Sequence, residues 1–368
     1  MENLGVIFAV VPDPRAGNAR HELTDVLVLA FAATLCGAET CCDMALFGRS
    51  KERLLREMLP LAHGIPSHDT FSRVFRLIDP EAFEAAFRRF AAAFAARLGG
   101  QAGLAGQVVA IDGKSLSCAF EAGARATPLH LVTAWAADQR LVLAQRRAPG
   151  RSETTAALEV VAMLDLLGAT VTADALHGTR RMAAAIRDRG GDYALAIKGN
   201  RGPLHRAMRD LLEGADPAGG ARTSEVAHGR EENRQAVVLP VPPDWPDRFG
   251  FAGLAAVARI DAVRRIGAAE QRHSRYFALS SEVSPLQALR IVRAHWTIEN
   301  GQHWLLDVVM DEDRARSRKD NAAENIALLR RLALNLLRTD PEKTSVRAKI
   351  KKAGWHDQYL LTLLGQMR

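Results

Sequence analysis

The chain has 368 residues, of which 48% are hydrophobic and 25% charged, as in a soluble globular protein with two or three compact units. Its net charge is +7 and arginine outnumbers lysine, which favours a polyanionic partner such as nucleic acid. The start lacks a basic signal-peptide segment, and the longest apolar stretch, near residues 26–38, is too short to span a bilayer. The four cysteines (Cys36, Cys41, Cys42 and Cys118) fit no zinc module. These features predict a cytoplasmic, nucleoid-associated protein with reduced thiols.

Residues 1–100 are predicted to form a helical N-terminal domain. Helices are expected near Glu22–Gly37 and Cys42–Met58, and Ser67 is a suitable N-cap for a helix through about Arg76. Asp79-Pro80 opens a further helix that continues to Leu98. Gly99-Gly100 then indicates a linker.

From residue 107 the apolar pattern becomes that of strands. The expected order is three strands, a helix, a strand, a helix and a strand. The strands are predicted at Val108–Ile111, Leu129–Ala136, Leu141–Gln145, Thr170–Ala173 and Tyr193–Ile197, with helices from Ser152 to Leu167 and from Thr179 to Arg189. This order is that of an α/β RNase H-like core with a mixed five-stranded sheet, in which the first and fourth strands are neighbours.

The core is predicted to be interrupted, so that it comprises residues 104–215 and 284–340. Residues 216–283 form a β-rich insertion, with strands at Gln235–Val241, Leu254–Ile260 and Arg275–Leu279. Long helices are expected at Pro285–Trp304 and Asn321–Arg338. Residues 341–368 form a tail that begins basic and ends apolar.

Three carboxylates are the candidate catalytic residues. Asp112 and Asp174 each follow a short apolar run, and the neighbouring strands should bring them together. Glu299 lies on a predicted helix that would pack on the sheet. Mg²⁺ prefers such oxygen ligands, and two Mg²⁺ ions can act on a phosphodiester. The alternative is that each aspartate only ends a strand or caps a helix.

Two other readings of the segment around Glu299 stay open. His295, Glu299 and His303 recur every four residues, so they would share a helix face and could bind Zn²⁺. Asp307 lies further along the same face and could supplement or replace Glu299 as third ligand. Asp311 and Asp313 follow it.

Basic residues near these carboxylates are candidate DNA contacts. Arg314, Arg316 and Arg318 form a run that is either a solvated face or a set of phosphate contacts. Lys114 and Lys198 each follow a strand and could orient phosphates, as could Arg180-Arg181.

Several motifs resemble those of insertion-sequence DDE transposases, specifically the H-repeat-associated group linked to Rhs elements. The motifs are Ala110-Ile111-Asp112-Gly113-Lys114, Thr172-Ala173-Asp174-Ala175-Leu176-His177, residues 190–200 and His295-Trp296-Thr297-Ile298-Glu299-Asn300. Residues 65–75 look like the group's N-terminal associated domain, and residues 303–308 with Glu312-Asp313 fit its C-terminal half. The resemblance covers nearly the whole chain.

The resemblance implies a Mg²⁺-dependent transposase, with Mn²⁺ as an alternative ion. Such an enzyme cuts DNA at terminal inverted repeats and joins the freed 3′-hydroxyl to target DNA. The family's acidic triad falls on Asp112, Asp174 and Glu299. On DNA we expect a homodimer or higher oligomer.

The chain departs from related transposases at supporting DNA contacts. Where those carry a tyrosine, an arginine and a lysine around the glutamate, this chain has Val292, His295 and Leu306. Arg293 or His295 could substitute as DNA contacts. Two alternatives therefore accompany the transposase reading: a catalytically inactive DNA-binding protein of the same fold, and a nuclease without a joining step.

Overall fold

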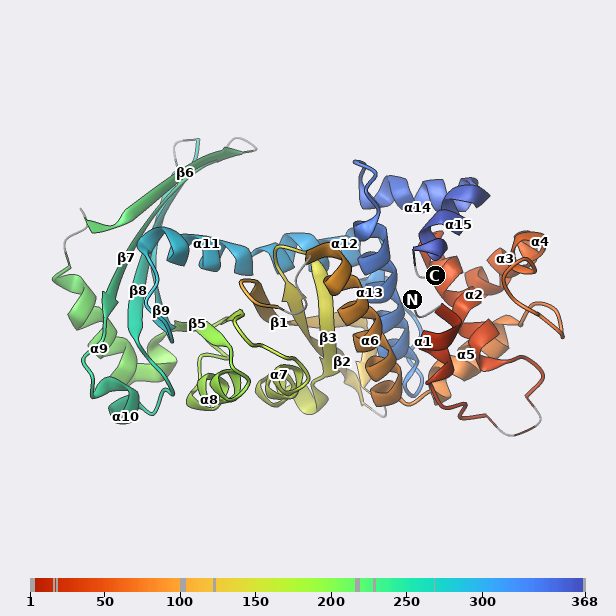
Figure 1. Ribbon diagram of the computed structural model, residues 1–368, viewed down its shortest axis with the longest axis horizontal. Helices are drawn as coiled ribbons and strands as arrows, with labels where there is room; N and C mark the ends of the chain where they lie inside the picture. Colours follow the sequence, from red (N-terminus) through yellow and green to blue (C-terminus); the bar gives the residue numbers. More distant parts are fainter. Residues whose placement is uncertain are drawn as a thin grey trace.

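The computed structural model describes residues 4–15, 17, 19–99, 104–121, 124–215, 219–227, 230–267 and 269–366. Figure 1 shows an elongated molecule with a lobe of helices at one end and strands extending to the other. Residues 1–3 and Gly100 lie outside the described parts, so the linker predicted at Gly99-Gly100 is described only at Gly99, the last residue of a helix. Every helix in those parts is too short or too polar to cross a membrane. The four cysteines are free thiols, as predicted.

The N-terminal part of the chain is helical, as predicted. The central run of the second helix, Val26 to Ala33, is fully apolar and buried on all sides, which explains its lack of a polar face. Ser67 Oγ accepts a hydrogen bond from the Thr70 N–H, which confirms the predicted N-cap. The helices are α1 (Leu4–Ala9), α2 (Leu23–Leu35), α3 (Cys41–Ser50), α4 (Glu52–Leu55), α5 (His68–Leu77) and α6 (Pro80–Gly99).

The second predicted helix is broken in the structure. The prediction of one helix over Cys42–Met58 is wrong because Lys51 leaves helical backbone, with φ −116° and ψ 19°. The chain then restarts as the short α4, whose Leu54 and Leu55 are buried. The apolar residues keep a helical spacing on both sides of Lys51, so their spacing alone did not indicate the break.

The described strands form one sheet in the order β3-β2-β1-β4-β5-β9-β8-β7-β6. They are β1 (Val108–Glu121), β2 (Ala124–Ala136), β3 (Leu141–Arg147), β4 (Thr170–Ala173), β5 (Asp192–Ile197), β6 (Ala221–Ala227), β7 (Arg230–Pro240), β8 (Ala256–Ile266) and β9 (Ala269–Leu279). The first three strands pair antiparallel, and β1-β4-β5 pair in parallel. The predicted neighbourhood of the first and fourth strands is confirmed.

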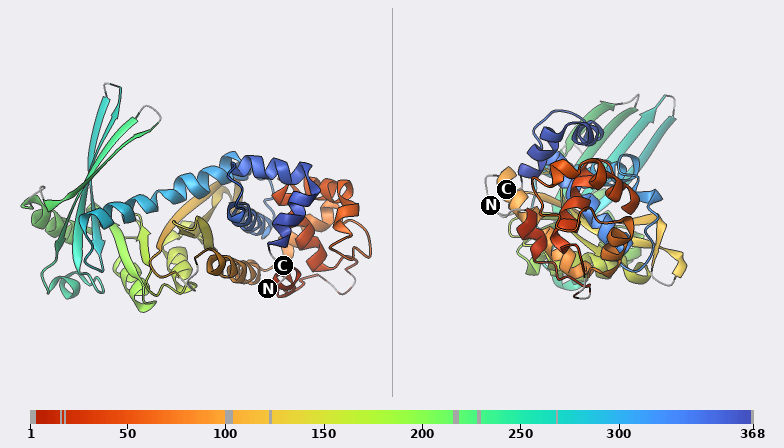
Figure 2. Two further views of the ribbon diagram at one scale, coloured as in Figure 1. Left: turned by 45° about the horizontal axis from the view of Figure 1, so that its top comes forward. Right: turned by 90° about the vertical axis from the view of Figure 1, so that its right-hand side faces the viewer.

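The predicted five-stranded sheet is too small, because the insertion continues it. β9 pairs antiparallel with β5, from Ala194 opposite Leu279 to Ile197 opposite Tyr276. This pairing satisfies backbone groups that an edge strand would leave open. The strand β6 was missed, since its sequence lacks a continuous apolar face. Figure 2 shows the hairpins of β6–β9 projecting away from the helices.

Helices cover both faces of the sheet. They are α7 (Glu153–Ala162), α8 (Arg180–Asp188), α9 (Gly202–Glu213), α10 (Trp245–Phe249), α11 (Pro285–His295), α12 (Trp304–Val308) and α13 (Ala322–Thr339), with 3₁₀ turns at Pro149–Arg151, Gly199–Arg201 and Glu312–Arg314 and a π turn at Glu299–His303. Figure 1 shows α7 and α8 on one side of the strands and α11 to α13 on the other. α7 ends at Ala162, short of the predicted Leu167, and the Ser152 hydroxyl bonds the Thr155 hydroxyl rather than a helix N–H. α9 was missed, although Leu204, Met208 and Leu212 are spaced at every fourth residue and buried.

The C-terminal tail packs into the same apolar core as the N-terminal helices. It forms α14 (Val346–Trp355) and α15 (Asp357–Gly365), whose Ile350, Leu360 and Leu363 join that core. α13 lies between this lobe and the sheet (Figure 1), and its leucines are buried. The two ends of the chain therefore pack together in one apolar core. The predicted limits of the domains stay a prediction.

Candidate active site

The two aspartates lie side by side in the sheet. β1 pairs in parallel with β4 from Val108 opposite Thr170 to Ile111 opposite Ala173, so Asp112 and Asp174 occupy the next position of each chain. Asp112 was predicted to follow the end of its strand, but it lies inside β1. β1 continues beyond β4 because it still pairs with β2, where Thr133 is opposite Asp112.

Strand alternation decides the face on which the aspartates lie. Val109 and Ile111 of β1 are buried in the core that contains α7 and α8. Side chains of a strand alternate between faces, so Asp112 lies on the opposite face. The same alternation separates Asp174 from Val171 and Ala173 of that core. Both carboxylates therefore face the side of the sheet covered by α11 and α12.

The helical segment from α11 to α12 crosses β1 and is anchored on both sides of it. At one end, His295 Nδ1 lies 3.1 Å from Thr172 Oγ1 of β4. At the other, the Gln302 side chain bonds Thr133 of β2, the residue opposite Asp112. The segment between these anchors contains a π turn, Glu299–His303, and such turns frequently occur at functional sites.

This crossing brings Glu299 and His303 to Asp112. One ligand atom from each of these three residues lies within 4.8 Å of the other two, which suits a metal ion. His303 Nδ1 is 3.8 Å from Asp112 Oδ2. Burial lowers the pKa of His303 to about 3, so the imidazole is neutral and offers a lone pair. Oxygen donors with one neutral nitrogen fit a divalent cation.

The zinc site predicted from the row of His295, Glu299 and His303 does not form among the described residues. Glu299 and His303, at the two ends of the π turn, stay together, whereas His295 lies before it at the end of α11. His295 bonds Thr172 instead. The metal-binding group contains Asp112 in its place.

Asp174 is held by its own loop. Its Oδ1 accepts hydrogen bonds from the backbone N–H groups of Leu176 (2.9 Å) and His177 (3.3 Å). The residue is exposed. Its negative charge acts on Asp112, and this interaction raises the pKa of Asp112.

Asp112 ionises with difficulty in the metal-free protein. Its burial, together with the negative charges of Glu299, Asp174 and Glu153, raises the pKa of Asp112 to about 7, against a lowering effect of the Gly113 N–H. One pKa unit corresponds to about 1.4 kcal/mol, so ionisation costs the folded state on the order of 4 kcal/mol. A bound cation would remove this cost, which is the electrostatic arrangement of a metal site.

Asp112→Asn is therefore expected to stabilise the metal-free protein in a pH-dependent way. The folded pKa of about 7 lies above the unfolded value of 3.8, so stability from this group is complete below 3.8 and is lost as pH rises to about 7. The variant should match wild type near pH 4 and exceed it by roughly 2–4 kcal/mol at pH 8. Thermal unfolding with a chelator between pH 4 and 8 measures this difference. A variant less stable than wild type at pH 8 would contradict the raised pKa.

A buried network behind the aspartates was missed from the sequence. Glu153, the first residue of α7, forms a hydrogen bond with His177 Nε2 through Oε1, and its Oε2 lies at ion-pair distance from His130 Nε2, each at 2.9 Å. Ser115 Oγ lies 2.8 Å from His130 Nδ1. The hydrogen bonds from His130 and His177 lower the pKa of Glu153 to about 2. No local spacing links these residues, since they come from β1, β2, α7 and the loop after β4.

The same network explains the glycine after Asp112. A Cβ at Gly113 would lie 2.5 Å from His130 Nε2 and 2.6 Å from Glu153 Oε1, closer than atoms can approach. Only glycine lets this network pack against β1. The network thus joins the strand that carries Asp112 to the loop that carries Asp174.

Glu153→Gln is expected to lower the free energy of unfolding by about 2–3 kcal/mol, because two charge-assisted hydrogen bonds lose their carboxylate. The variant should also weaken Mn²⁺ binding by about 10–100-fold, because residues that hold metal ligands in position typically have effects of this size when they are replaced. Urea unfolding and calorimetry measure these effects. Glu159→Gln on the same helix is the matched control, since Glu159 is 52% exposed and its pair with Arg146, at 3.4 Å, should contribute under about 1 kcal/mol. Equal metal affinity in the two variants would exclude a positioning role for Glu153.

Asp307 is not among the residues grouped around Asp112. Its Oδ1 lies 2.7 Å from Lys114 Nζ, which also lies 3.1 Å from Asp313. Lys114 was predicted to contact DNA phosphate, but its side chain is buried between these carboxylates. A phosphate could reach it only by breaking those pairs. Lys114 instead neutralises the acidic segment that follows α12.

The other predicted DNA contacts divide into partly buried and exposed groups. His295 is half-buried, and desolvation lowers the pKa of His295 to about 4, so it is neutral and a poor phosphate contact. Arg293 is exposed but forms an ion pair with Glu225 of β6. The remaining residues are exposed: Lys198 at the end of β5, and Arg314, Arg316 and Arg318 after α12. Arg318 donates to the Cys118 carbonyl of β1.

Comparisons with known proteins agree with the sequence motifs. Residues 103–336 match the family model described as "Transposase DDE domain", and residues 6–91 match the model "DDE_Tnp_1-associated". The protein "Putative transposase YncI" of Escherichia coli O157:H7 is 34% identical over 368 residues, covering 97% of this chain and 93% of that protein. "H repeat-associated putative transposase YhhI" of Escherichia coli K12 is 33% identical over 369 residues, covering 97% and 96%. A shorter relative, "Inactive transposase YbfQ" of the same strain, is 37% identical over 68 residues, covering 18% of this chain and 81% of that protein.

The DDE family model spans more than half of the chain, and the first two relatives align over almost all of it. Both relatives exceed 30% identity. The chain belongs to the DDE transposase family, in its H repeat-associated group.

Proposed function

We propose that this protein is a transposase that cleaves DNA at the ends of its element and joins the freed 3′-hydroxyl to target DNA. One observation carries the proposal. A helical segment anchored on β4 and β2 brings Glu299 to Asp112, which lies beside Asp174 in the sheet. The strand order β3-β2-β1-β4-β5 further supports an RNase H-like core.

Asp112, Glu299 and His303 form the group whose ligand atoms lie close together, and Asp174, at the adjacent position of the sheet, would join Asp112 and Glu299 in holding Mg²⁺ or Mn²⁺. Bound divalent ions would supply charge neutralisation and a lowered pKa for an attacking water. The chain's own part is to place the carboxylates. The Leu176 and His177 N–H groups orient Asp174, and the Glu153 network fixes its loop relative to Asp112.

The proposed reaction has two steps. Water attacks the phosphorus at the element end, the bond to the 3′-oxygen breaks, and that oxygen gains a proton to become a free 3′-hydroxyl. This hydroxyl then attacks a target phosphodiester, displacing the target's own 3′-oxygen and forming a new phosphodiester. Exposed Arg314, Arg316 and Lys198 would contact DNA phosphates around the site. Two element ends must meet for this outcome, which favours a homodimer or higher oligomer on DNA.

The test uses a supercoiled plasmid that carries the reading frame with its natural flanking DNA. Purified protein with Mg²⁺ should release 3′-hydroxyl ends and produce joined products, both absent with a chelator. Hydrolysed ends without joined products would favour a nuclease. The proposal fails if no metal-dependent product forms with Mg²⁺ or Mn²⁺.

A specific observation favours a second candidate, a non-catalytic DNA-binding protein of this fold. The positions that carry an arginine and a lysine in related transposases hold His295, which is half-buried and neutral, and Leu306, which is fully buried. Neither can replace a cationic phosphate contact. A relative named "Inactive transposase YbfQ" shares part of this sequence. Binding of the flanking DNA without cleavage would identify this candidate.

A further inference from the structure

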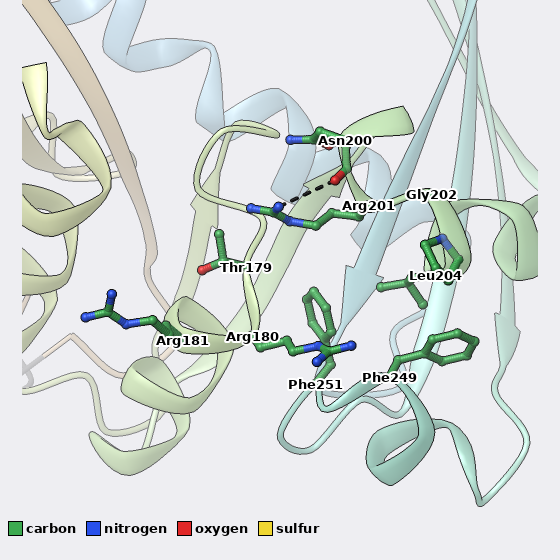
Figure 3. Close-up of a pocket in the computed structure, with 10 residues that line it drawn as sticks. Thr179, Arg180, Arg181, Asn200, Arg201, Gly202, Leu204, Phe249 and Phe251 are labelled. Atoms are coloured by element: carbon green, nitrogen blue, oxygen red, sulfur yellow. Dashed lines mark hydrogen bonds between the residues drawn. The ribbon is translucent and has the colours of Figure 1, made fainter.

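A second concave site adjoins the loop that carries Asp174. It is a pocket of about 400 Å³ between the start of α8, the start of α9 and the α10–β8 connection (Figure 3). Three arginines line it: Arg180, Arg181 and Arg201. We propose that this pocket binds a phosphate of the DNA backbone next to the phosphodiester held at Asp174.

The pocket is strongly cationic. Among the described residues, no carboxylate pairs with Arg180, Arg181 or Arg201, whereas the nearby Arg187 pairs with Asp192 and Arg209 with Glu213. Arg180 and Arg181 are both exposed. Arg180 and Arg201 extend into the pocket, whereas the guanidinium of Arg181 points away from them (Figure 3). The guanidinium groups of Arg180 and Arg201 repel each other, and an anion would relieve this repulsion. The planar guanidinium fork suits phosphate oxygens in particular.

The pocket is attached to the loop that carries Asp174. Asn200 Nδ2 donates to the Ala175 carbonyl at 2.9 Å, and Arg201 Nε donates to the Gly178 carbonyl at 2.8 Å. Both carbonyls belong to the stretch between Asp174 and α8. The positions of the pocket and of Asp174 are thereby linked. A DNA strand at Asp174 would have neighbouring phosphates within reach of this cationic wall.

The opposite wall holds Arg180 in place. Phe249 and Phe251 are buried, and the glycine between them has a φ of +65°. A Cβ at Gly250 would lie 3.1 Å from Arg180 Cδ, so the aliphatic stem of Arg180 packs directly on this turn. Packing of the stem restricts the guanidinium and lowers the entropy lost on phosphate binding. The apolar floor also keeps competing carboxylates away.

This inference rests on DNA as the partner in the proposed function, but not on catalysis. The test variant is R180A/R181A, and the matched control is R206A/R209A, which removes two exposed arginines from α9 outside the pocket. Binding of a fluorescent 30-base-pair duplex is measured by anisotropy with a chelator between 50 and 200 mM salt. The slope of log affinity against log salt should fall by about 1–2 in the test variant, since each lost phosphate contact contributes about 0.9. The control should change the slope by less than about half as much.

A charge-retaining variant separates charge from folding. R180K/R181K should keep most of the wild-type slope and unfold near the wild-type temperature, because lysine retains both the charge and an aliphatic stem that packs on the Gly250 turn. Equal slopes in test and control variants would overturn the inference while leaving the proposed function intact. A wild-type protein that binds no DNA would overturn both. Calorimetry with inorganic phosphate forms a separate arm: phosphate binding lost in R180A/R181A, with an unchanged DNA slope, would show a site for free phosphate and overturn the DNA assignment.

Discussion

Asp112→Asn and Asp174→Asn are each expected to lower the rate of metal-dependent DNA cleavage by at least about a thousandfold. The register of β1 and β4 places the two carboxylates at adjacent positions, and an amide in either place removes a negative charge from the site. The fold should survive, since burial raises the pKa of Asp112 and its neutral form is already favoured there. Plasmid cleavage with Mg²⁺ measures the rate, and anisotropy without metal should show DNA affinity within about twofold of wild type. Wild-type cleavage in either variant would remove that residue from the site.

The third ligand is tested in the same assay. Glu299→Gln should resemble the aspartate variants, because Glu299 and His303 are the residues grouped with Asp112. Asp307→Asn should keep most of the activity, because Asp307 is paired with Lys114. The reverse result would make Asp307 the ligand.

Arg331→Met is expected to lower the free energy of unfolding by about 3–5 kcal/mol, the largest stability effect of any change considered. Arg331 and Glu312 are both fully buried, and Arg331 Nη1 lies 2.6 Å from Glu312 Oε1. Removal of the guanidinium leaves a buried carboxylate whose remaining cation, Lys114, is 4.0 Å away and shared with Asp307 and Asp313. Methionine has a similar length, so the cavity cost stays small. Urea unfolding measures the loss.

The double variant E312L/R331M is the informative comparison. Replacing both charges by apolar side chains removes the unpaired carboxylate, so most of the lost stability should return. Arg209→Met is the surface control, since its pair with Glu213 is exposed and should contribute less than about 1 kcal/mol. An R331M loss below about 1 kcal/mol would mean that Glu312 is solvated or protonated without its partner.

Much of the fold could be predicted because local chemistry agrees with it. The Ser67 N-cap, the helix at 322–339 and the five strands of the central sheet each carry a local signal, and right-handed crossover rules then fix the neighbours of β1. Local signals failed where partners are remote. The β-rich insertion continues the sheet because β9 satisfies the open edge of β5, and nothing within either strand indicates that pairing.

The candidate site divides in the same way. Asp112, Asp174 and Glu299 were predicted from residue type and position and stay a prediction as catalytic residues, while the predicted contact between the first and fourth strands is confirmed. The roles predicted for Lys114 and His295 depended on exposure, which a sequence does not report. Lys114 is surrounded by carboxylates from residues 307–313, and His295 is half-buried with its Nδ1 beside the Thr172 hydroxyl.

By itself, the amino-acid sequence determined the family and the strand order that places Asp112 beside Asp174, and it predicted the three acidic residues, because these follow from residue identity and local periodicity. Only the tertiary structure decided which residues surround them. The π turn that brings His303 to Asp112, the Glu153 network behind Gly113 and the arginine pocket beside Asp174 are each assembled from segments distant in the chain. Such contacts depend on packing and hydrogen bonding between elements, and neither is encoded in the spacing of residues within one element.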